Sequence, residues 1–137
     1  MSNPDRLDTR VKLSTLWIVV LLNMLFADIF SIMVELVTKN TLEIPGEVST
    51  VMAIAAIVTN IPILMVYFSR ALTHRANRRA NIVAGVLTIG YVVGGGDSAP
   101  HYLIIASLEV ALLLVIIVSA WRWTSPENLA DVSAAPA

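Results

Sequence analysis

Two acidic residues stand inside long apolar stretches of this sequence, where an ionised side chain is costly. Asp28 lies in the apolar stretch 13–37, and Glu109 lies in the stretch 101–121. A charge at the centre of a bilayer costs about 2.5–3.5 kcal/mol on insertion scales, so such residues are functional by default. Two neighbouring carboxyl groups can share a proton or hold a cation, because they resist double ionisation. Asp28 and Glu109 are therefore the candidate proton- or ligand-binding pair.

Position along the two stretches favours this pairing. Asp28 precedes Val37 by nine residues, and Glu109 follows His101 by eight. At a helical rise of about 1.5 Å per residue, both carboxyls lie roughly 12–14 Å below the same surface. If the two helices are neighbours, the carboxyls meet. The alternative is two protonated acids that hydrogen-bond to backbone or to polar side chains of other helices.

Glu35 extends the candidate site toward the outer surface. It follows Asp28 by seven residues and so shares its helix face. Glu35 can form the mouth of a pathway to Asp28. The favoured alternative is an ion pair with Lys39, four residues further along the same helix.

Asn60 is the remaining candidate ligand residue. It stands near the centre of the stretch 48–70, two residues before Pro62. Proline leaves the carbonyl of Val58 without its helical donor, and within a membrane that carbonyl must be satisfied locally. We expect Asn60 or Thr59 to satisfy it; the second possibility is that Asn60 lines a pocket beside the kink.

Several kinds of chemistry are excluded by residue type. The chain has no cysteine, which removes disulfides, thiolate metal sites and thiol catalysis. Its two histidines are expected on opposite sides of a membrane, so one bis-histidine haem is impossible within a single bundle. No phosphate loop, zinc signature or serine-nucleophile elbow appears. The net charge of -1 argues against nucleic acid as a partner. We expect no metal and no cofactor.

The elements that must position the two acids are membrane helices. Of 137 residues, 57% are hydrophobic and 14% charged, against about one quarter charged in soluble domains. A span needs roughly 20 apolar residues. This predicts an all-α, polytopic four-transmembrane-helix bundle, with spans at 13–37, 48–70, 81–96 and 101–121. The first stretch is too long for the apolar core of a signal peptide, so it is expected to be an uncleaved anchor.

The remaining segments are polar or rich in small residues. Residues 71–80 hold four basic side chains and are predicted to be a water-facing connection, although the short third span is expected to borrow helical length from them. Asp97 or Ser98 can cap the fourth helix, with Pro100 in its first turn. Gly90 and Gly94 predict close packing along the third helix.

Charge predicts the orientation of the bundle. With four spans, both termini and the 71–80 connection share one side. That side would carry Arg6, Arg10, Lys12, Arg70, Arg75, Arg78, Arg79 and Arg122, and the other side only Lys39. Cytoplasmic loops carry the excess of Lys and Arg, so both termini are predicted to be cytoplasmic. The tryptophans Trp17, Trp121 and Trp123 would lie at the inner interface.

The chain is thus predicted to have three parts. Residues 1–12 form a cytoplasmic N-terminal segment, 13–123 the transmembrane domain, and 124–137 a disordered cytoplasmic tail rich in Ala, Ser and Pro.

The opening of the chain resembles a known family. The stretch Lys12-Leu13-Ser14-Thr15-Leu16-Trp17-Ile18, followed by Leu22-Asn23-Met24 and Phe26-Ala27-Asp28, looks like the start of an uncharacterised family of small bacterial four-helix membrane proteins. The resemblance implies that Asn23 and Asp28 belong to the family's motif, and it implies no activity. Asn23 lies on a different helix face from Asp28, so we expect it to bond a neighbouring helix.

The sequence is compatible with three classes of function. The leading expectation is a non-enzymatic, multi-pass protein of the bacterial inner membrane that binds or transports a small amphipathic or cationic ligand through Asp28 and Glu109. The alternatives are a small membrane enzyme, in which the two acids act on a lipid-like substrate as general acid and base, and a structural subunit. The expected partners are the lipid bilayer and a second copy of the chain, joined through the third helix.

Overall fold

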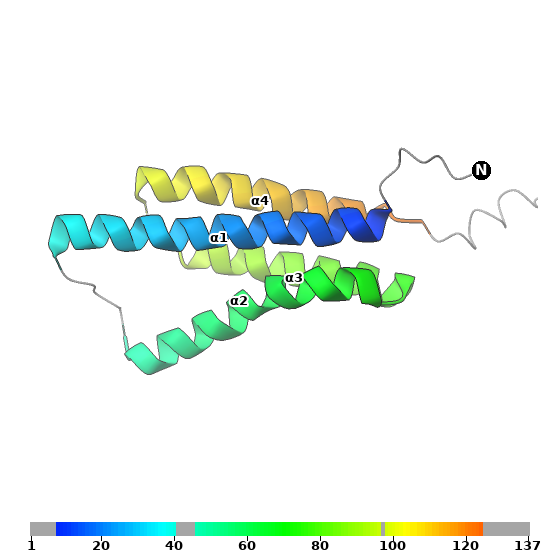
Figure 1. Cartoon of the computed structure of the whole chain (residues 1–137), viewed down its shortest axis with the longest axis horizontal. Helices are drawn as coiled ribbons and strands as arrows, with labels where there is room; N and C mark the ends of the chain where they lie inside the picture. The colour runs from blue at the N-terminus through cyan, green and yellow to red at the C-terminus, as the bar shows by residue number, and fades with distance from the viewer. Residues whose placement is uncertain (1–7, 41–45, 97, 125–137) are drawn as a thin grey trace, which may run out of the picture.

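The computed structural model describes residues 8–40, 46–96 and 98–124. It contains four α-helices, α1 (Thr9–Lys39), α2 (Val48–Ala71), α3 (His74–Gly94) and α4 (Pro100–Trp121), and no strand within the described ranges. Successive helices run in opposite directions, and each packs against two others to form an up-down bundle (Figure 1). The predicted tail disorder concerns residues 125–137, which lie outside the described ranges.

The helix ends follow local capping rules. The side chain of Asp8 accepts a hydrogen bond from the backbone N–H of Arg10 at 3.2 Å and begins α1. Asn40 ends this helix with a positive φ of 55°. Pro100 stands in the first turn of α4, as predicted, but Ser98 is not its cap: the N-cap is Ala99, without a side-chain hydrogen bond. Asp97 lies outside the described residues.

Three of the four helices are long and apolar enough to cross a membrane, namely α1, α2 and α4. The expectation of four such spans is therefore confirmed for three helices and not for α3. The reason is the first half of α3, which begins at His74 and carries Arg75, Arg78 and Arg79. The expectation that helix extends into this basic segment is confirmed. The picture of 71–80 as a water-facing connection is wrong, because Asn77 is fully buried.

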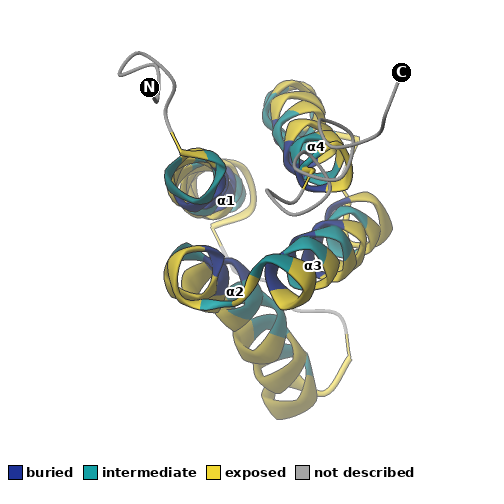
Figure 2. Ribbon diagram, turned by 90° about the vertical axis from the view of Figure 1, so that its right-hand side faces the viewer, coloured by how far each residue is buried: buried dark blue, intermediate teal, exposed yellow. Residues whose placement is uncertain are grey.

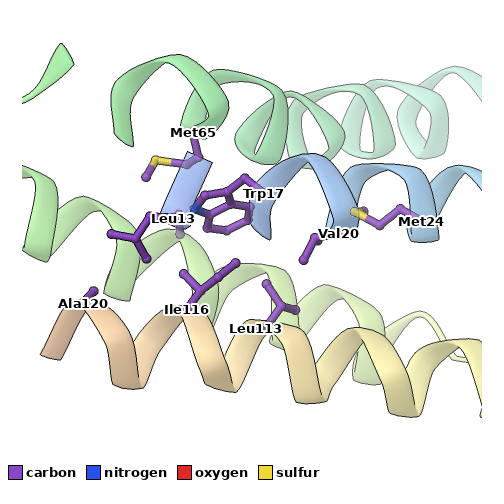
Figure 3. Close-up of a cluster of buried hydrophobic side chains, with 9 residues drawn as sticks. Leu13, Trp17, Val20, Met24, Met65, Leu113, Ile116 and Ala120 are labelled. Carbon is purple, nitrogen blue, oxygen red and sulfur yellow. The ribbon is translucent and has the colours of Figure 1, made fainter. Parts of the chain in front are cut away.

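The hydrophobic core lies toward the end of the bundle where α1 begins. Leu13, Trp17 and Val20 of α1 meet Leu113 and Ile116 of α4 (Figure 3). Trp17 is 0% exposed, so its ring packs in the core instead of facing out of the bundle toward lipid headgroups. Whether an aromatic ring packs in the core or faces outward depends on the residues packed against it. Those residues come from distant parts of the sequence, so local sequence does not predict the burial of Trp17.

The opposite end of the bundle is open. No described residue of α1 beyond Ala27 is buried, and none of α2 before Pro62. The first half of α2 leans away from the other helices (Figures 1 and 2). Pro62 lies within α2, and proline is a common cause of helix bending. The segment of α1 beyond Ala27 therefore contacts less protein than the first half of the helix.

Close helix approach occurs at a different glycine from the predicted pair. A Cβ atom on Gly85 would lie 2.8 Å from Cγ1 of Ile117, so α3 and α4 approach closely there. A Cβ atom on Gly90 or Gly94 would meet nothing within 4 Å. The predicted tight packing at Gly90 and Gly94 is therefore wrong within the chain, and a homodimer through that face stays a prediction.

Candidate functional site

Glu109 is the buried carboxyl of the bundle. Its residue is 3% exposed and stands on α4 opposite α1. Asn23 of α1 donates through Nδ2 to the carbonyl of Ile105 at 3.0 Å, and the same nitrogen lies 3.4 Å from Glu109 Oε2. The expectation that Asn23 bonds a neighbouring helix is confirmed. The second carboxyl oxygen, Glu109 Oε1, is buried and has no hydrogen-bond partner among the described residues.

Asp28 lies near this carboxyl but in a different environment. Electrostatic interaction joins Asp28 to Glu109, and it joins the phenol of Tyr91 on α3 to both acids. No hydrogen bond links the two carboxyls in the described structure, and Asp28 is exposed on the isolated bundle. The three side chains come from α1, α3 and α4. The arrangement is one interior acid, one acid toward the outside of the bundle, and a phenol within electrostatic range of both.

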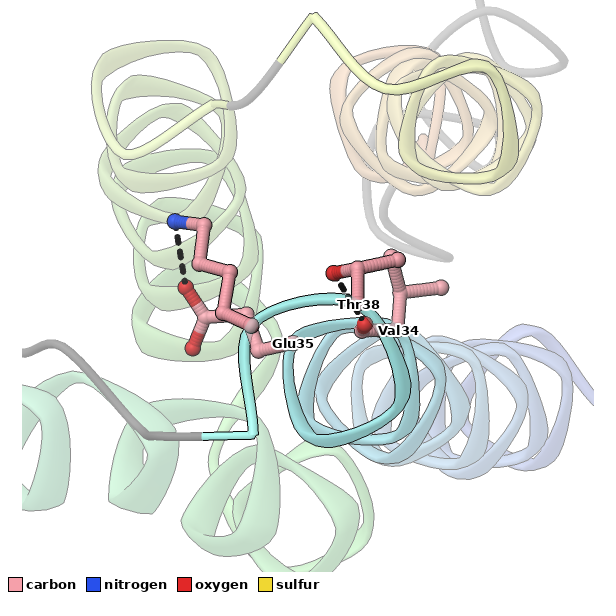
Figure 4. A network of polar contacts seen from close by, with 4 residues as sticks. Val34, Glu35 and Thr38 are labelled. Carbon is pink, nitrogen blue, oxygen red and sulfur yellow. Dashed lines mark hydrogen bonds and ion pairs between the residues drawn. The ribbon is translucent and has the colours of Figure 1, made fainter.

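Glu35 forms the predicted ion pair with Lys39. Its Oε1 lies 3.5 Å from Nζ of Lys39 (Figure 4). In the same turn, the hydroxyl of Thr38 donates to the carbonyl of Val34 at 2.6 Å. These contacts occur within the last turns of α1, toward its C-terminal end. Within the described structure, no hydrogen bond or ion pair connects Glu35 with Asp28 or Glu109.

Asn60 does not repair the break at Pro62. Its Nδ2 donates to the carbonyl of Ala56 at 2.7 Å, and the hydroxyl of Thr59 donates to Ala55 at 2.9 Å. Neither side chain bonds the carbonyl of Val58, so the predicted repair is wrong. Both side chains instead donate to carbonyls four residues earlier, in the first half of α2, which leans away from the bundle. Asn60 is exposed there, and among the described residues it forms no hydrogen bond with Glu109.

A buried polar network joins α1, α2 and α3 at the other end of the bundle. The indole Nε1 of Trp17 donates to Oδ1 of Asn81 at 2.7 Å. The hydroxyl of Ser69 donates to the same oxygen at 3.2 Å, and Asn81 Nδ2 donates to Asn77 Oδ1 at 2.6 Å. Asn77 in turn donates to the carbonyl of Ser69 at 2.6 Å. Each polar group here has a partner, which identifies the network as structural.

Sequence reasoning missed this network. Asn77 was assigned to a connection and Asn81 to the first position of a span, although their four-residue spacing puts them on one helix face. That four-residue spacing could have indicated a polar helix face buried against other helices. The partner Trp17 lies 64 residues away in the chain, and no local pattern predicts the contact.

All four helix ends at this side of the bundle meet around Trp123. The ring of His74 packs edge-on against it with 4.6 Å between centroids, and Nε2 of His74 lies 3.2 Å from its carbonyl oxygen. The guanidinium of Arg10 lies 6.0 Å from the same ring and donates to the carbonyl of Arg70 at 3.4 Å. The starts of α1 and α3 and the ends of α2 and α4 therefore share one end, which carries every described Arg and Lys except Lys39.

Comparison with known proteins decides the family but not the activity. A model described as a family of unknown function (DUF6326) matches residues 5–130. The chain belongs to this family. The match covers all four helices, so the resemblance noted at the start of the chain is confirmed over nearly its whole length. No curated protein and no solved structure matches the chain.

In this member of the family, the chemistry of the candidate site is that of acids and a phenol. Within the described residues no group of three His, Asp or Glu side chains is placed to hold a metal ion. His101, at the start of α4, has a buried Nε2 without a described hydrogen-bond partner. Proton transfer and attraction of a cation are the events that Glu109, Asp28 and Tyr91 can support.

Proposed function

We propose that Glu109, together with Asp28 and Tyr91, binds a proton or a small amphipathic cation inside a membrane. One observation carries the proposal: Glu109 Oε1 is buried and has no described hydrogen-bond partner, while Oε2 has only the 3.4 Å contact with Asn23. An unpaired carboxylate oxygen in an apolar interior is costly. A proton or a cation at that oxygen removes the cost.

The two acids have different roles in this proposal. Asp28 is exposed on the side of α1 that lies beyond the core, and it interacts electrostatically with Glu109. It would receive the cation first, and Glu109 would hold it. The apolar surroundings select ligands with an apolar body, because a strongly hydrated cation would lose its water on entering. Glu35 and Asn60 are outside this proposed site, since the one pairs with Lys39 and the other with its own helix.

The bundle is proposed to lie in the inner membrane of a bacterium with its basic end in the cytoplasm. The gathering of Arg and Lys at one end supports this orientation. It would put both ends of the chain in the cytoplasm. The helix α3 would then run at the same depth as its neighbours α2 and α4, which cover part of its polar surface. It would depend on them for insertion, because it is not apolar enough on its own.

The test is binding and transport of a lipophilic cation. The full chain is reconstituted into liposomes, and binding of tetraphenylphosphonium is measured as a function of pH, together with proton release on binding. Wild-type protein should bind the cation and lose it on acidification, because protons compete for the same carboxylate. Glu109→Gln should reduce binding at least tenfold, since an amide carries no charge for the cation to meet.

Glu35→Gln is the matched control, because it removes the same charge from a carboxylate already paired with Lys39. It should bind like the wild type. Equal binding by Glu109→Gln and the wild type would overturn the proposal, as would a loss of similar size in Glu35→Gln.

A further inference from the structure

A second polar hollow lies at the basic end of the bundle, far along α4 from Glu109. It lies where α1 begins and α4 ends, and it has a volume of about 400 Å³. Its polar lining consists of Thr9, Lys12, Ser119, Arg122, Trp123 and Thr124. This volume lies within the range of about 300–1,000 Å³ that is typical of small-molecule sites. The hollow therefore has room for a charged group such as a phosphate.

The lining of the hollow is cationic. Lys12 and Arg122 are exposed and form no ion pair with a described residue, and no acidic side chain is among the described residues that line the hollow. The hydroxyls of Thr9 and Ser119 add hydrogen-bond donors, whereas that of Thr124 donates to the carbonyl of Arg122 at 3.4 Å. The positive end of the α1 dipole and the negative end of the α4 dipole meet there and oppose each other. The two side-chain charges therefore decide the sign, and the hollow favours an anion.

One wall of the hollow is held in place. Trp123 packs against the His74 ring, and the Arg10 guanidinium lies over its indole. Tryptophan is enriched at the headgroup level of membranes. On the membrane side, Val115 and Val118 of α4 are exposed, and Val118 also borders the hollow. An anion bound here would thus have an apolar helix surface next to it on which acyl chains can lie.

We propose that this hollow binds the phosphate group of an anionic phospholipid. The recognising chemistry is a phosphate oxygen anion against a lysine, an arginine and hydroxyl donors. Free inorganic phosphate offers the same group, and the exposed apolar surface of α4 next to the hollow is what favours the lipid. This site is separate from the proposed carboxylate site and does not depend on it.

The test counts lipids on the full-length protein. Purified wild-type protein in detergent is titrated with phosphatidylglycerol, with phosphatidylcholine and, separately, with inorganic phosphate, and bound molecules are counted by native mass spectrometry. We expect one tightly held phosphatidylglycerol, and weaker binding of the other two. Lys12→Gln/Arg122→Gln should weaken that first binding about 30-fold, since a cation near an anionic headgroup contributes about fivefold in affinity.

Two further variants make the test specific. Arg75→Gln/Arg79→Gln removes the same charge from exposed arginines of α3 that do not line the hollow, and it should retain the first lipid. Ser119→Leu fills the hollow without changing any charge, and it should lose the lipid as the double variant does. Far-ultraviolet circular dichroism confirms that each variant is helical.

The outcomes separate the sources of the phosphate. Binding of inorganic phosphate as tightly as phosphatidylglycerol would assign the site to a free anion and overturn the lipid proposal. Equal losses in the α3 variant and in the Lys12/Arg122 variant would show diffuse attraction instead of a site. Retention of the lipid by Ser119→Leu would place the binding elsewhere.

Discussion

At the scale of single residues, the side chain of Asn81 connects three helices. It accepts from the indole of Trp17 on α1 and from the hydroxyl of Ser69 on α2, and it donates to Asn77 on its own helix. A buried donor that loses its acceptor keeps its full desolvation cost, about 1–3 kcal/mol. Loss of the Asn81 amide would therefore cost the energy of its own hydrogen bonds and, in addition, the desolvation penalty of the buried donors left without an acceptor.

We expect Asn81→Ala to lower the free energy of unfolding by about 1–3 kcal/mol, because it leaves the Trp17 indole N–H unpaired in the core. The measurement is unfolding of the detergent-solubilised protein by sodium dodecyl sulfate, followed by circular dichroism. Asn60→Ala is the control, since that amide is exposed and bonds only its own helix. Its change should stay within about 0.5 kcal/mol. Similar losses in both variants would contradict a structural role for the network.

Glu47 is the N-cap of α2, and its ionisation makes the stability of the first turn of that helix depend on pH. Hydrogen bonds from the Ser49 hydroxyl, and then from the hydroxyl and backbone N–H of Thr50, lower the pKa of Glu47 to about 2 from the ordinary 4.5. A lowered pKa means that the carboxylate stabilises the folded helix start above pH 4.5. The stabilisation is lost as the pH falls from 4.5 toward 2.

We therefore expect the first turn of α2 to fray on acidification through that range. Amide hydrogen exchange at Thr50, corrected for the intrinsic pH dependence of exchange, should accelerate below pH 4.5 in the wild type. Glu47→Gln should remove this pH dependence. Persistence of the same acceleration in Glu47→Gln would assign it to another group.

Local spacing predicted some of the single-residue contacts correctly and others not. The Glu35–Lys39 pair follows from a four-residue spacing and is present at 3.5 Å. Glu109 stands in an apolar stretch and is buried in the bundle, whereas its depth in a membrane stays a prediction. Trp17 and Asn81 were assigned other roles, because each needs the other as a partner and the two lie on different helices. Burial against a partner depends on helix rotation, which spacing alone does not determine.

At the scale of elements, α3 differs from the other three helices. It begins in a basic segment, contains buried Asn77 and Asn81, and approaches α4 closely at Gly85. Helical residues such as Arg and Ala extend it back to His74, seven residues before the apolar stretch that begins at 81. Hydropathy selects α1, α2 and α4 as candidate spans because they are apolar along most of their length. It does not select α3, whose first half carries Arg75, Arg78 and Arg79.

We expect Gly85→Ala to destabilise the bundle by about 1–3 kcal/mol, because the new methyl group would overlap Ile117 and push α3 from α4. Gly90→Ala adds the same methyl group where nothing lies within 4 Å. It should be neutral or stabilising by about 0.4–1 kcal/mol, through the lower entropy of the unfolded chain. Unfolding curves of both variants in one detergent make the comparison. Stabilisation by Gly85→Ala would contradict the close approach of the two helices.

At the scale of the whole molecule, the bundle has a tight basic end and an open end. The core and the polar network occupy the tight end, and the candidate carboxylates lie where the bundle begins to open. Local stability follows buried contacts, so the open end is expected to fluctuate more than the tight end. Binding residues placed there can reach a ligand without unfolding the core.

The absence of cysteine allows a direct test of topology. Single cysteines are introduced at the exposed positions Asn40, Thr73 and Ser98 and labelled in intact cells with a membrane-impermeant maleimide. With the proposed orientation, Asn40→Cys and Ser98→Cys are labelled from outside and Thr73→Cys only after lysis. Labelling of Ser98→Cys together with Thr73→Cys would show that α3 does not cross.

The unequal lengths of the helices make the protein sensitive to bilayer thickness. With 31 residues, α1 is about 46 Å long, whereas the 22 residues of α4 extend about 33 Å, close to the hydrocarbon thickness of about 30 Å. Hydrophobic mismatch is relieved by tilting or by projection of the longer helix into water. Because α1 carries Asp28 and α4 carries Glu109, a change in the tilt of α1 relative to α4 would slide the two acids past each other. Acyl-chain length would thus tune the distance between the two carboxyls.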